Sequence, residues 1–437
     1  MRSFIPKELF EFLKCHKTYI VGGAVRNYLL PRSSVTKDFD FVIFSQTSTL
    51  KEISETLAKQ TKSSFVELDK ETQTYRIVNK CWEADITAPR GQNIEEDLKA
   101  RDFTINAMAW DLQSESLIDP LNGKVDLKDN LMRAISKQNL LDDPLRCLRA
   151  YRIKSQVSQK SDKSFVFESN TEIWLKELFP LIKTVSIERI SQEIWLLMSQ
   201  DKCYEGLKEL FETGVWEDLI PEFKELRKVP PNDFHHLPLT LHTLELIKQY
   251  EETVQDKLPS ECLKFIKSNA INFIPVNAIV KMGCLLHDIA KPETWEIKEG
   301  KHTFYGHDAI GSEMTERIGK RMRWPKAVRA TLSSLVKQHL RPFHIAPIGS
   351  EPTARAERRF FRKLDCDFYP LIALAWSDLL STRGPMISDT MIMESEKRLI
   401  ALCKNYEGFQ KQEEKTPLLL NGDYLKQAIK EAGLAPN

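Results

Sequence analysis

Two aspartates, Asp38 and Asp40, lie two positions apart in the apolar segment DFDFVIF. The alternation predicts a β-strand with both carboxylates on one face and with Phe39 and Phe41 on the other. Carboxylates about 7 Å apart along a strand repel each other unless a cation lies between them. A hard divalent ion fits this position, and Mg²⁺ does so while also holding substrate phosphates. The alternative is a pair of solvated acids on an exposed sheet face.

The segment WEADIT offers a third acid on another predicted strand, because its alternation places Glu83 and Asp85 on one side. In a two-metal site the ions lie about 3.5–4 Å apart, one activating the attacking hydroxyl and one bridging the leaving phosphates. Acids on neighbouring strands can hold such a pair. We therefore predict Asp38, Asp40 and Asp85 as the catalytic carboxylates.

A glycine pair, Gly22 and Gly23, follows the apolar run TYIV and precedes the helical segment AVRNYLL. Glycine lets the backbone approach a ligand closely, and the N–H groups at a helix start can bind phosphate. Arg26 can add a charge-assisted contact. On its own the pair also fits an ordinary strand-to-helix turn. Beside a metal-binding acid pair, it predicts nucleotidyl transfer from a nucleoside triphosphate.

The composition is that of a globular protein without a strong overall charge. The 437 residues are 42% hydrophobic and 29% charged, and the formal net charge is +1, so a nucleic-acid site has to be a local patch. No apolar run approaches the roughly 18 residues of a membrane span, and the N-terminus does not read as a signal peptide. The scattered cysteines, without a CxxC pair, predict reduced thiols in a cytoplasmic protein.

The predicted elements change in kind along the chain. The first 135 residues read as α/β, with a helix at 49–61 and strands at 18–21, 38–44, 64–68, 74–78 and 82–87. From about residue 140 helical spacing dominates, as at 142–153, 186–200 and 203–214. The predicted fold class is therefore α+β, with a head of mixed sheet and helices followed by an all-α remainder.

Several motifs occur in a fixed order: GGAVRNYLL with DFD, ARDFTINAMA, IDPLNGK, DDPLRCLRAYR and SIERISQE. In this order they resemble class II tRNA nucleotidyltransferases and bacterial poly(A) polymerases, densely over residues 18–200. A looser likeness to members with an HD domain continues to about residue 385. The resemblance implies a nucleotidyltransferase head at 1–135, a base-reading neck at 136–200, body helices at 201–234, an HD-type helical region at 235–385, and tail helices at 386–437 with a C-terminus that reads as incomplete.

The resemblance also implies roles for single residues, beginning with Asp38 and Asp40 as ligands of catalytic Mg²⁺. The other matched positions are, for the triphosphate, Gly22, Gly23 and Arg26; for ribose and phosphate, Arg101, Asp102 and Asn106; and, for the base, Asp143, Arg146, Arg149 and Arg152. The chain departs from the family pattern at Asn27 (usually Asp), Pro31 (commonly Gly), Ala100 (often Arg) and Asp142 (usually Glu). None of these departures removes a metal ligand.

The predicted base-reading pair is Asp143 and Arg146. A carboxylate and a guanidinium in one plane match the donor and acceptors of cytosine, and a slightly rotated pair serves adenine. From the residues alone, helix capping is the stronger interpretation, with Asp143 at the N-cap and Pro144 at the first helical position.

A short connection, TAPRGQNIEE, joins the Asp85 strand to the helix at Leu98. Family members that build the complete CCA end resemble one another in a longer flexible connection, which helps the base site switch from C to A. The short one predicts a CC-adding enzyme that uses CTP and the tRNA 3′ end, with no membrane and no obligate protein partner. Complete CCA addition, A addition from ATP, poly(A) synthesis and neutral variation of loop length remain alternatives. So do an HD phosphohydrolase whose head positions RNA and a non-catalytic RNA-binding module.

An ordered series of histidines and aspartates lies in helical segments of the second half: His242, His287, Asp288, His307, His339 and Asp378. The series resembles HD metal-dependent phosphohydrolases. Imidazole and carboxylate ligands together suit Mn, Ni, Fe or Zn, and a metal there would generate hydroxide to attack a phosphoester. Each histidine taken singly reads as an ordinary core or surface residue.

Basic clusters predict contacts with RNA phosphates at Arg146 to Lys154, at 319–329 and at 355–363. Trp324, Phe360 and Phe361 are interleaved with them and would stack on bases or sugars. The alternative is a set of solvated faces whose aromatic side chains belong to the core.

Overall fold

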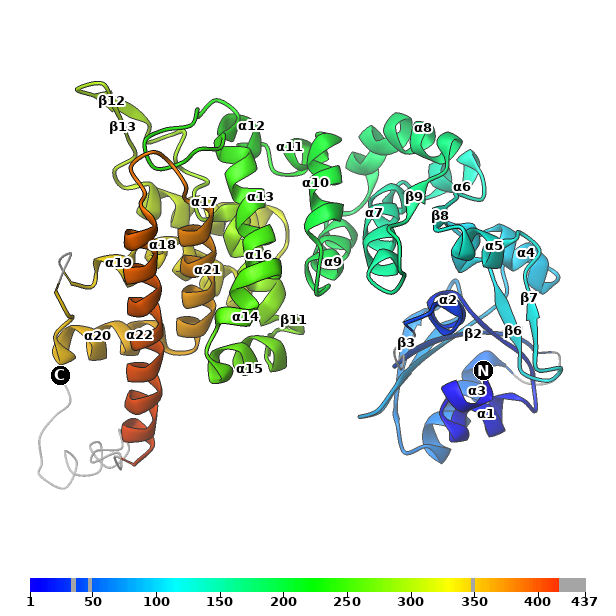
Figure 1. Ribbon diagram of the computed structural model, residues 1–437. Coiled ribbons are helices and arrows are strands. Elements are labelled where there is room, and N and C mark those ends of the chain that lie inside the picture. The colour runs from blue at the N-terminus through cyan, green and yellow to red at the C-terminus, as the bar shows by residue number, and fades with distance from the viewer. Residues whose placement is uncertain (33–36, 46–48, 347–349, 416–437) are drawn as a thin grey trace, which may run out of the picture. The chain divides into compact units, whose positions relative to one another are not determined.

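The computed structural model describes residues 1–32, 37–45, 49–346 and 350–415 (Figure 1). The chain divides into two compact units, Met1–Leu219 and Ile220–Asn437. The first contains a large sheet and the second is built mainly from helices, so the predicted α+β class is confirmed. The predicted tail beyond Lys415, and with it the C-terminal end, lies outside the described residues.

The first unit is organised around a seven-stranded sheet with the order β3-β4-β5-β2-β1-β6-β7. Its strands are β1 (Lys17–Val21), β2 (Asp38–Phe44), β3 (Ser64–Asp69), β4 (Thr74–Val78), β5 (Glu83–Thr87), β6 (Ala109–Asp111) and β7 (Ser116–Ile118). Neighbouring strands pair antiparallel except β2 and β5, which are parallel. The five strands predicted from alternation are confirmed, each to within one residue at either end.

The two faces of β2 differ as the alternation predicts. Phe39 and Phe41 are buried with their rings stacked at 6.3 Å, whereas Asp38 and Asp40 are exposed on the other face. Helix α1 (Lys7–Leu13) buries Leu9, Phe10 and Leu13, and helix α3 (Leu50–Gln60) packs against β4. A capping box formed by Thr49 and Glu52 begins α3.

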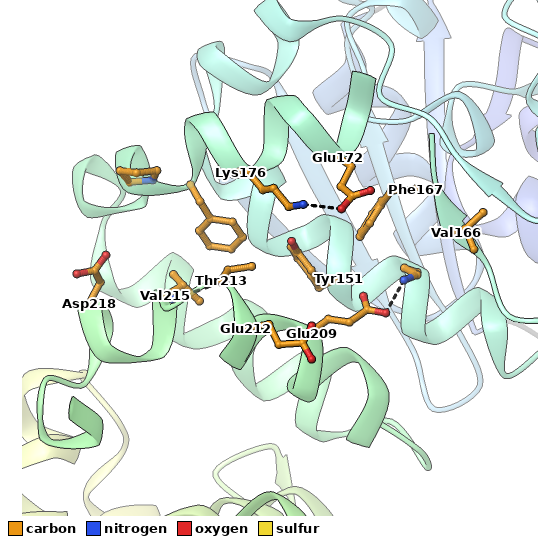
Figure 2. A pocket seen from close by; sticks show the side chains of 13 residues that line it. Tyr151, Val166, Phe167, Glu172, Lys176, Glu209, Glu212, Thr213, Val215 and Asp218 are labelled. Atoms are coloured by element: carbon orange, nitrogen blue, oxygen red, sulfur yellow. Dashed lines mark hydrogen bonds and ion pairs between the residues drawn. The ribbon is translucent and has the colours of Figure 1, made fainter. Parts of the chain in front are cut away.

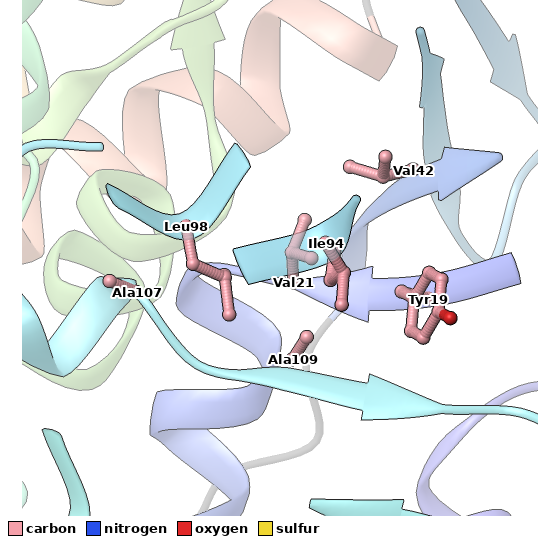
Figure 3. Packing of buried hydrophobic residues seen from close by; sticks show 7 residues of the cluster. All are labelled: Tyr19, Val21, Val42, Ile94, Leu98, Ala107 and Ala109. Atoms are coloured by element: carbon pink, nitrogen blue, oxygen red, sulfur yellow. The ribbon is translucent and has the colours of Figure 1, made fainter. Parts of the chain in front are cut away.

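A compact apolar cluster covers the carboxylate-bearing face farther along the strands (Figure 3). It consists of Tyr19, Val21, Val42, Ile94, Leu98, Ala107 and Ala109. Val21 pairs directly with Asp40 and therefore points to the same face. Helix α4 (Ile94–Lys99) closes the cluster, so the face is apolar at one end and carries Asp38 and Asp40 at the other.

The rest of the first unit is mostly helical. Its helices are α2 (Gly23–Leu29), α5 (Gly123–Lys128), α6 (Lys137–Asp142), α7 (Leu145–Ser158), α8 (Ser169–Leu178), α9 (Ile187–Met198), α10 (Tyr204–Glu212) and α11 (Val215–Leu219). One small parallel pair, β8 (Leu131–Met132) with β9 (Val166–Phe167), interrupts the region predicted as helical. Helix α7 packs against α9 and α10, and this packing positions its arginines.

The second unit is a helical array with two short hairpins. Its α-helices are α12 (Glu222–Leu226), α13 (Leu239–Gln249), α14 (Gln255–Lys257), α15 (Ser260–Ser268), α16 (Val276–Leu286), α17 (His307–Arg321), α18 (Lys326–Gln338), α19 (Arg341–His344), α20 (Ala354–Leu364), α21 (Phe368–Ser381) and α22 (Asp389–Lys415). The hairpins pair β10 (Ala270–Ile271) with β11 (Ile274–Pro275), and β12 (Glu296–Lys298) with β13 (Lys301–Thr303). Helices α13, α16 and α21 pack on one another, and α17 packs on α18.

The aromatic side chains predicted to stack on RNA are instead part of the core, so that prediction is wrong. Trp324, Phe360 and Phe361 are each at most 4% exposed. Phe361 lies 5.4 Å from Tyr406 and 5.6 Å from Phe409 of α22, measured between ring centroids. Apolar area drives this packing, and the charged residues of α20 remain outside.

All eight cysteines are free thiols. Within the described residues, none of the helices has the length and apolar character needed to cross a bilayer.

Candidate active site and candidate metal centre

Gly22 forms the bend between β1 and α2, and its backbone has φ +70°. A Cβ at this position would lie 3.3 Å from Asp40 Oδ2 and 3.4 Å from Arg101 Nη1. Few residues other than glycine adopt this conformation, and a side chain would fill the space between the carboxylate and the arginine. Gly23 has no positive φ, and a Cβ there would have Arg26 Nη2 as its nearest atom, at 3.6 Å.

The three predicted catalytic acids lie on two adjacent strands. Asp40 pairs with Asp85 across the parallel β2–β5 ladder, and Asp38 pairs with Glu83. Desolvation in the recessed site, together with the charges of Asp85 and Asp38, raises the pKa of Asp40 to about 6, although Arg101 opposes the shift. The Asp40 residue is nevertheless exposed to solvent on the sheet face. It is therefore partly desolvated at the floor of a cleft and is not buried in the protein core. Oxygen donors that repel one another on an open face fit Mg²⁺.

Asp85 is already paired with an arginine that the sequence analysis did not single out. Arg76 of β4 donates from Nε and Nη2 to the two Asp85 oxygens at 2.7 and 2.8 Å. This bidentate contact raises the pKa of Arg76 and engages both oxygens. As a metal ligand, Asp85 would have to share an oxygen with Arg76. The antiparallel register of β4 and β5 places Arg76 opposite Asp85, and a sequence pattern does not contain that register.

Arg26 is buried and holds neutral partners rather than a carboxylate. Its Nη1 donates to Asn106 Oδ1 at 2.7 Å, and its Nη2 donates to Gln156 Oε1 and to Asn27 Oδ1, both at 3.1 Å. Burial and, next, the charge of Arg152 lower the pKa of Arg26 to about 10. Asn27, where the family usually has Asp, therefore orients this guanidinium without neutralising it. The positive charge stays available to an anion in the adjoining cavity.

Asp102 links the arginine motif to helix α7. Its Oδ1 accepts from Asn106 Nδ2 at 3.0 Å and from the Phe103 N–H at 2.8 Å, and Arg149 Nη1 lies 3.6 Å from its Oδ2. Burial alone would raise the pKa of Asp102, but Arg149 and these hydrogen bonds lower it below the ordinary value. Arg101 donates from Nε and Nη2 to Asp97 of α4 at 3.0 and 2.8 Å.

Glu193 of α9 is a further acid that the sequence analysis did not single out. It is 5% exposed and accepts from Arg149 Nε at 3.2 Å and from Arg152 Nε at 2.6 Å. The motif SIERISQE contains Glu193, but helical spacing alone does not show which glutamate turns inward. Glu193 fixes both arginines of α7 relative to Asp102.

Most of the predicted residues line one cavity of about 280 Å³, called here the head pocket. Its walls include Gly22, Gly23, Arg26, Asp38, Asp40, Arg101, Asp102, Asn106, Arg149 and Arg152. Among the predicted head and neck residues, all of which lie in the described part of the chain, Asp85, Asp143 and Arg146 do not line it. The pocket thus combines two open carboxylates with four arginines.

The predicted base-reading pair has other partners in this structure. Asp143 Oδ1 accepts from the Leu145 N–H at 3.3 Å, and its Oδ2 accepts from Arg189 Nη2 at 2.8 Å. The predicted capping by Asp143 with Pro144 at the first helical position is wrong, because Pro144 is itself the N-cap of α7 and the helix begins at Leu145 without a side-chain cap. Arg146 donates to the carbonyl oxygens of Ala100, Arg101 and Asn139 at 3.0–3.2 Å. A base could be read only after some of these bonds are exchanged.

A second and larger cavity of the first unit, of about 640 Å³, lies away from this chemistry (Figure 2). Tyr151 and Phe167 form part of its wall, and it is lined by Lys154 of the predicted RNA-contacting cluster but by none of the predicted catalytic, nucleotide-binding or metal-binding residues. Its lysines are paired with acids: Lys176 with Glu172 at 2.6 Å, and Lys154 with Glu209 at 2.5 Å. Because these charges are neutralised within the protein, this cavity is a weaker candidate for a phosphate ligand.

The second unit brings together all six residues of the predicted HD series, called here the HD cluster: His242, His287, Asp288, His307, His339 and Asp378. His242 lies on α13, His287 and Asp288 follow the end of α16, and Asp378 lies on α21. His307 begins α17, and His339 follows the end of α18. Each of the six residues is at most 9% exposed. Their possible ligand atoms fall into overlapping groups whose members lie within 4.8 Å of one another. Asp288 belongs to two of these groups and can bridge two ions.

The imidazoles of the HD cluster are oriented as metal ligands are. His287, His307 and His339 share Nδ1 hydrogen bonds with the carbonyls of Cys284, Phe304 and Val336 at 2.7–2.9 Å. Each ring therefore turns Nε2 toward the centre. The buried Nε2 atoms of His242 and His287 make no hydrogen bond of regular geometry within the described residues, and they lie 3.3 Å from Asp378 Oδ1 and 3.1 Å from Asp288 Oδ2. Buried imidazole nitrogens that face carboxylates in this way fit a metal-binding site for an ion that accepts both ligand types.

Electrostatics in the HD cluster keep Asp288 charged and favour the neutral form of His242 and His339, whereas Asp288 and Asp378 outweigh burial and raise the pKa of His287. Burial would raise the pKa of Asp288, but His287 and Lys291 outweigh it and hold that pKa well below the ordinary value. Burial lowers the pKa of His242 and lowers that of His339 to about 4. Neutral imidazole and ionised carboxylate are the forms that bind metals.

Two residues beside the HD cluster were not predicted. Lys291 Nζ lies 2.5 Å from Asp288 Oδ2, and the His235 ring lies 4.5 Å from that of His242. Burial and the charge of Lys291 lower the pKa of His235 to about 2. The segment HDIAK places Lys291 one helical turn after Asp288, a spacing that could have identified it.

Three family models match successive parts of the chain. Residues 18–133 match the poly A polymerase head domain, residues 164–226 match the probable RNA and SrmB-binding site of polymerase A, and residues 243–403 match the HD domain. Their order follows that of the head pocket, the helices after it and the HD cluster.

Curated relatives are tRNA nucleotidyltransferases of different specificity. The chain is 28% identical to an A-adding tRNA nucleotidyltransferase of Deinococcus radiodurans over 425 residues, which span 95% of this chain and 87% of the relative. It is 37% identical to a CC-adding enzyme of Synechocystis over 196 residues, 45% of each chain. With a CC-adding enzyme of Thermus thermophilus it shares 27% identity over 86% of this chain and 79% of the relative.

Solved structures share the fold. A tRNA nucleotidyltransferase complexed with a primer tRNA and an incoming ATP analog superposes with a TM-score of 0.59 at 20% identity, covering 91% of this chain and 98% of that one. An apo tRNA-processing enzyme gives 0.61 at 20% identity, covering 98% and 97%. These likenesses show the shared fold. The three matched models and the aligned relatives show that the chain belongs to the class II tRNA nucleotidyltransferase family and carries an HD domain.

Proposed function

We propose that this enzyme adds two cytidines to the 3′ end of tRNA from CTP, and that Asp38 and Asp40 are its catalytic carboxylates. The division into a head at 1–135, a neck at 136–200, body helices at 201–234, an HD region at 235–385 and a tail at 386–437 is part of the proposal. The observation that carries the cytidine specificity is the connection between β5 and α4.

That connection is short and held in place. It runs from Ala88 to Asn93. The Arg90 N–H donates to Asp97 Oδ1 at 3.1 Å, the Gln92 N–H donates to Glu96 Oε2 at 2.8 Å, and Asn93 caps α4. Complete CCA builders carry a longer flexible connection here, as the family resemblance implies. A segment pinned to its own helix is poorly suited to switching the base site from C to A, which favours CC addition.

The proposed mechanism uses the residues of the head pocket. Mg²⁺ held by Asp38 and Asp40 would supply charge that offsets the phosphates and lowers the pKa of the attacking hydroxyl. The absence of a Cβ at Gly22 leaves room for phosphate beside Asp40, and Arg26 and Arg101 supply positive charge there. The 3′ hydroxyl oxygen of tRNA attacks the α-phosphorus of CTP, the α–β phosphoanhydride bond breaks, and pyrophosphate leaves.

Base selection is assigned to Asp143 and Arg146 in this proposal. Cytosine would replace Arg189 at Asp143 and one of the carbonyl contacts of Arg146. Each exchange trades one charge-assisted hydrogen bond of Asp143 or Arg146 for another, and the released Arg189 side chain is half exposed. Arg149 and Arg152, fixed by Glu193, are placed to contact the nucleotide at the helix α7 side of the head pocket.

The main alternative is A addition, because the Deinococcus relative that aligns along 95% of this chain is A-adding. Three tRNA primers distinguish the activities: one without the CCA end, one ending in C and one ending in CC. Under CC addition, CTP extends the first by two residues and the second by one, while ATP does not extend the third. Extension of the third primer by ATP would contradict the proposal. The variants Asp38→Ala and Asp40→Ala should extend none of them.

We further propose that the HD cluster hydrolyses a phosphoester, because its imidazole nitrogens and carboxylate oxygens converge within 4.8 Å in groups that fit bound metal ions. Asp288 would bridge the ions and Lys291 would keep Asp288 ionised. The test is release of p-nitrophenol from bis(p-nitrophenyl) phosphate with added Mn²⁺. His287→Ala should abolish release and Asp40→Ala should not. Equal rates for His287→Ala and the wild type would contradict this activity.

A further inference from the structure

A basic cavity of about 770 Å³ in the second unit opens beside the HD cluster. The start of α17, the α18–α19 junction and α20 form its walls. His307 lines the cavity and also belongs to the HD cluster, where its Nε2 lies 3.4 Å from Asp288 Oδ1. The cavity, called here the basic pocket, therefore reaches the candidate metal centre.

Four cations line the basic pocket: Lys337, Arg341, Arg359 and Lys363. All four are exposed, and Asp308 is the one carboxylate among the lining residues. Across residues 1–32, 37–45, 49–346 and 350–415, no ion pair or side-chain hydrogen bond engages any of the four.

Several other cations in this unit are neutralised by acids. Arg321 pairs with Glu222 at 2.6 Å, and Arg362, on another side of α20, pairs with Glu413 at 2.7 Å. Four unneutralised charges around one concave site raise the local potential and attract an anion. They also repel one another, so the pocket is more stable when a polyanion occupies it.

The spacing of these cations indicates several anionic groups on the ligand. Arg359 and Lys363 lie one helical turn apart on α20, about 6 Å along its axis, and Lys337 and Arg341 have the same sequence spacing. Tyr305 at the rim is 78% exposed and offers a flat surface for a base. The volume lies in the range of small-molecule sites rather than of long strand-binding grooves.

We propose that the basic pocket binds a nucleoside polyphosphate whose terminal phosphate reaches the HD cluster. Its phosphate contacts are Lys337, Arg341, Arg359 and Lys363, and Tyr305 stacks on its base. This inference rests on the proposed phosphohydrolase activity of the HD cluster and names its substrate class.

The test titrates the metal-free, full-length protein with mant-GTP and follows the fluorescence of the mant group. GTP is chosen because guanine presents an N1–H donor where the proposed cytosine site needs an acceptor, so the head pocket should not compete. The double variant Arg341→Ala, Arg359→Ala should raise the Kd about tenfold or more, and GMP should displace the probe about tenfold less well than GTP. Arg358→Ala, which removes a neighbouring exposed arginine of α20 that does not line the pocket, should change the Kd less than about twofold.

Several outcomes overturn the proposal. The double variant could bind mant-GTP as the wild type does, or GMP could compete as well as GTP. A single-stranded oligoribonucleotide that displaces the probe at lower concentration than GTP would assign the pocket to a strand end instead. The hydrolytic function is judged separately. If binding of mant-GTP depends on Arg341 and Arg359 but the protein does not hydrolyse GTP with Mn²⁺, the proposed binding site stands and the proposed phosphohydrolase activity is refuted. If the protein hydrolyses GTP and the double variant has an unchanged KM, the activity stands and the proposed binding site is refuted.

Discussion

Replacing Asp40 with asparagine should stabilise the metal-free protein while abolishing nucleotidyl transfer. The pKa of Asp40 is raised from 3.8 to about 6, chiefly by desolvation and then by Asp85 and Asp38. The folded state therefore holds a proton more tightly than the unfolded state, and ionisation of Asp40 opposes folding. This cost is absent below about pH 4, grows as the pH rises toward 6, and is complete above it.

The size of the effect follows from the shift. About two pKa units correspond to ~3 kcal/mol if the whole shift acts on folding. Because the side chain is exposed on the sheet face, solvent screening reduces the expected gain to ~1 kcal/mol. In a unit of this size, that gain moves the Tm by about 2–4 °C. Asparagine keeps the shape of the side chain and removes the charge.

The assay is differential scanning calorimetry of the wild type and Asp40→Asn in EDTA at pH 4.5, 5.5 and 7.5. The variant should unfold at the higher temperature at pH 7.5, and the gap should close as the pH falls. Added MgCl₂ should stabilise the wild type and leave Asp40→Asn unchanged. Glu71→Gln, which removes an exposed acid outside the head pocket, is the control. Equal Tm values at pH 7.5 in EDTA, or a gap that does not depend on pH, would refute the electrostatic account of this site.

Three further predictions concern single residues. Gly22→Ala should cost about 1–3 kcal/mol of stability in urea unfolding and raise the KM for the nucleotide, since its φ is +70°, whereas Gly23→Ala should leave stability within about 1 kcal/mol. His287→Ala should lower the metal content measured by plasma mass spectrometry while primer extension stays within about twofold; an unchanged metal content would remove it as a ligand. Glu193→Ala leaves two arginines without their shared carboxylate and should cost ~2 kcal/mol, against less than ~0.5 kcal/mol for Glu172→Ala, whose ion pair is exposed. Equal costs in urea unfolding would show that burial does not strengthen the Glu193 contacts.

The sequence alone predicted the features that depend on local periodicity. The strands of the head and the placement of Asp38 and Asp40 on one face follow from a period of two, which nearest neighbours along the chain impose. Likewise, the bend at Gly22 follows from the change from strand to helical spacing. The order of histidines and aspartates indicated the HD cluster through its resemblance to HD phosphohydrolases, and in the structure each of these residues lies on a helix or within two residues of its end.

The sequence alone did not predict which side chains of different helices and strands contact one another. Arg76 meets Asp85 through the register of β4 and β5, and Glu193 meets the arginines of α7 through helix packing. The sequence alone favoured capping by Asp143 and could not show that its second oxygen binds Arg189. An arginine could pair with any of several carboxylates elsewhere in the chain. Their spacing along the sequence does not show which one it meets in the folded protein.

The sequence by itself determined the class of chemistry, the α+β fold and the positions of the acids and histidines that carry it. Only the tertiary structure decided that Trp324 and Phe360 belong to the core and that Arg359 and Lys363 of α20 line a pocket in which no acid of the described residues pairs with them. Alternation and helical spacing are set by neighbours along the chain, whereas burial and charge neutralisation depend on segments far apart in sequence. Those long-range pairings are selected by the packing of the whole unit, and no short window of residues contains them.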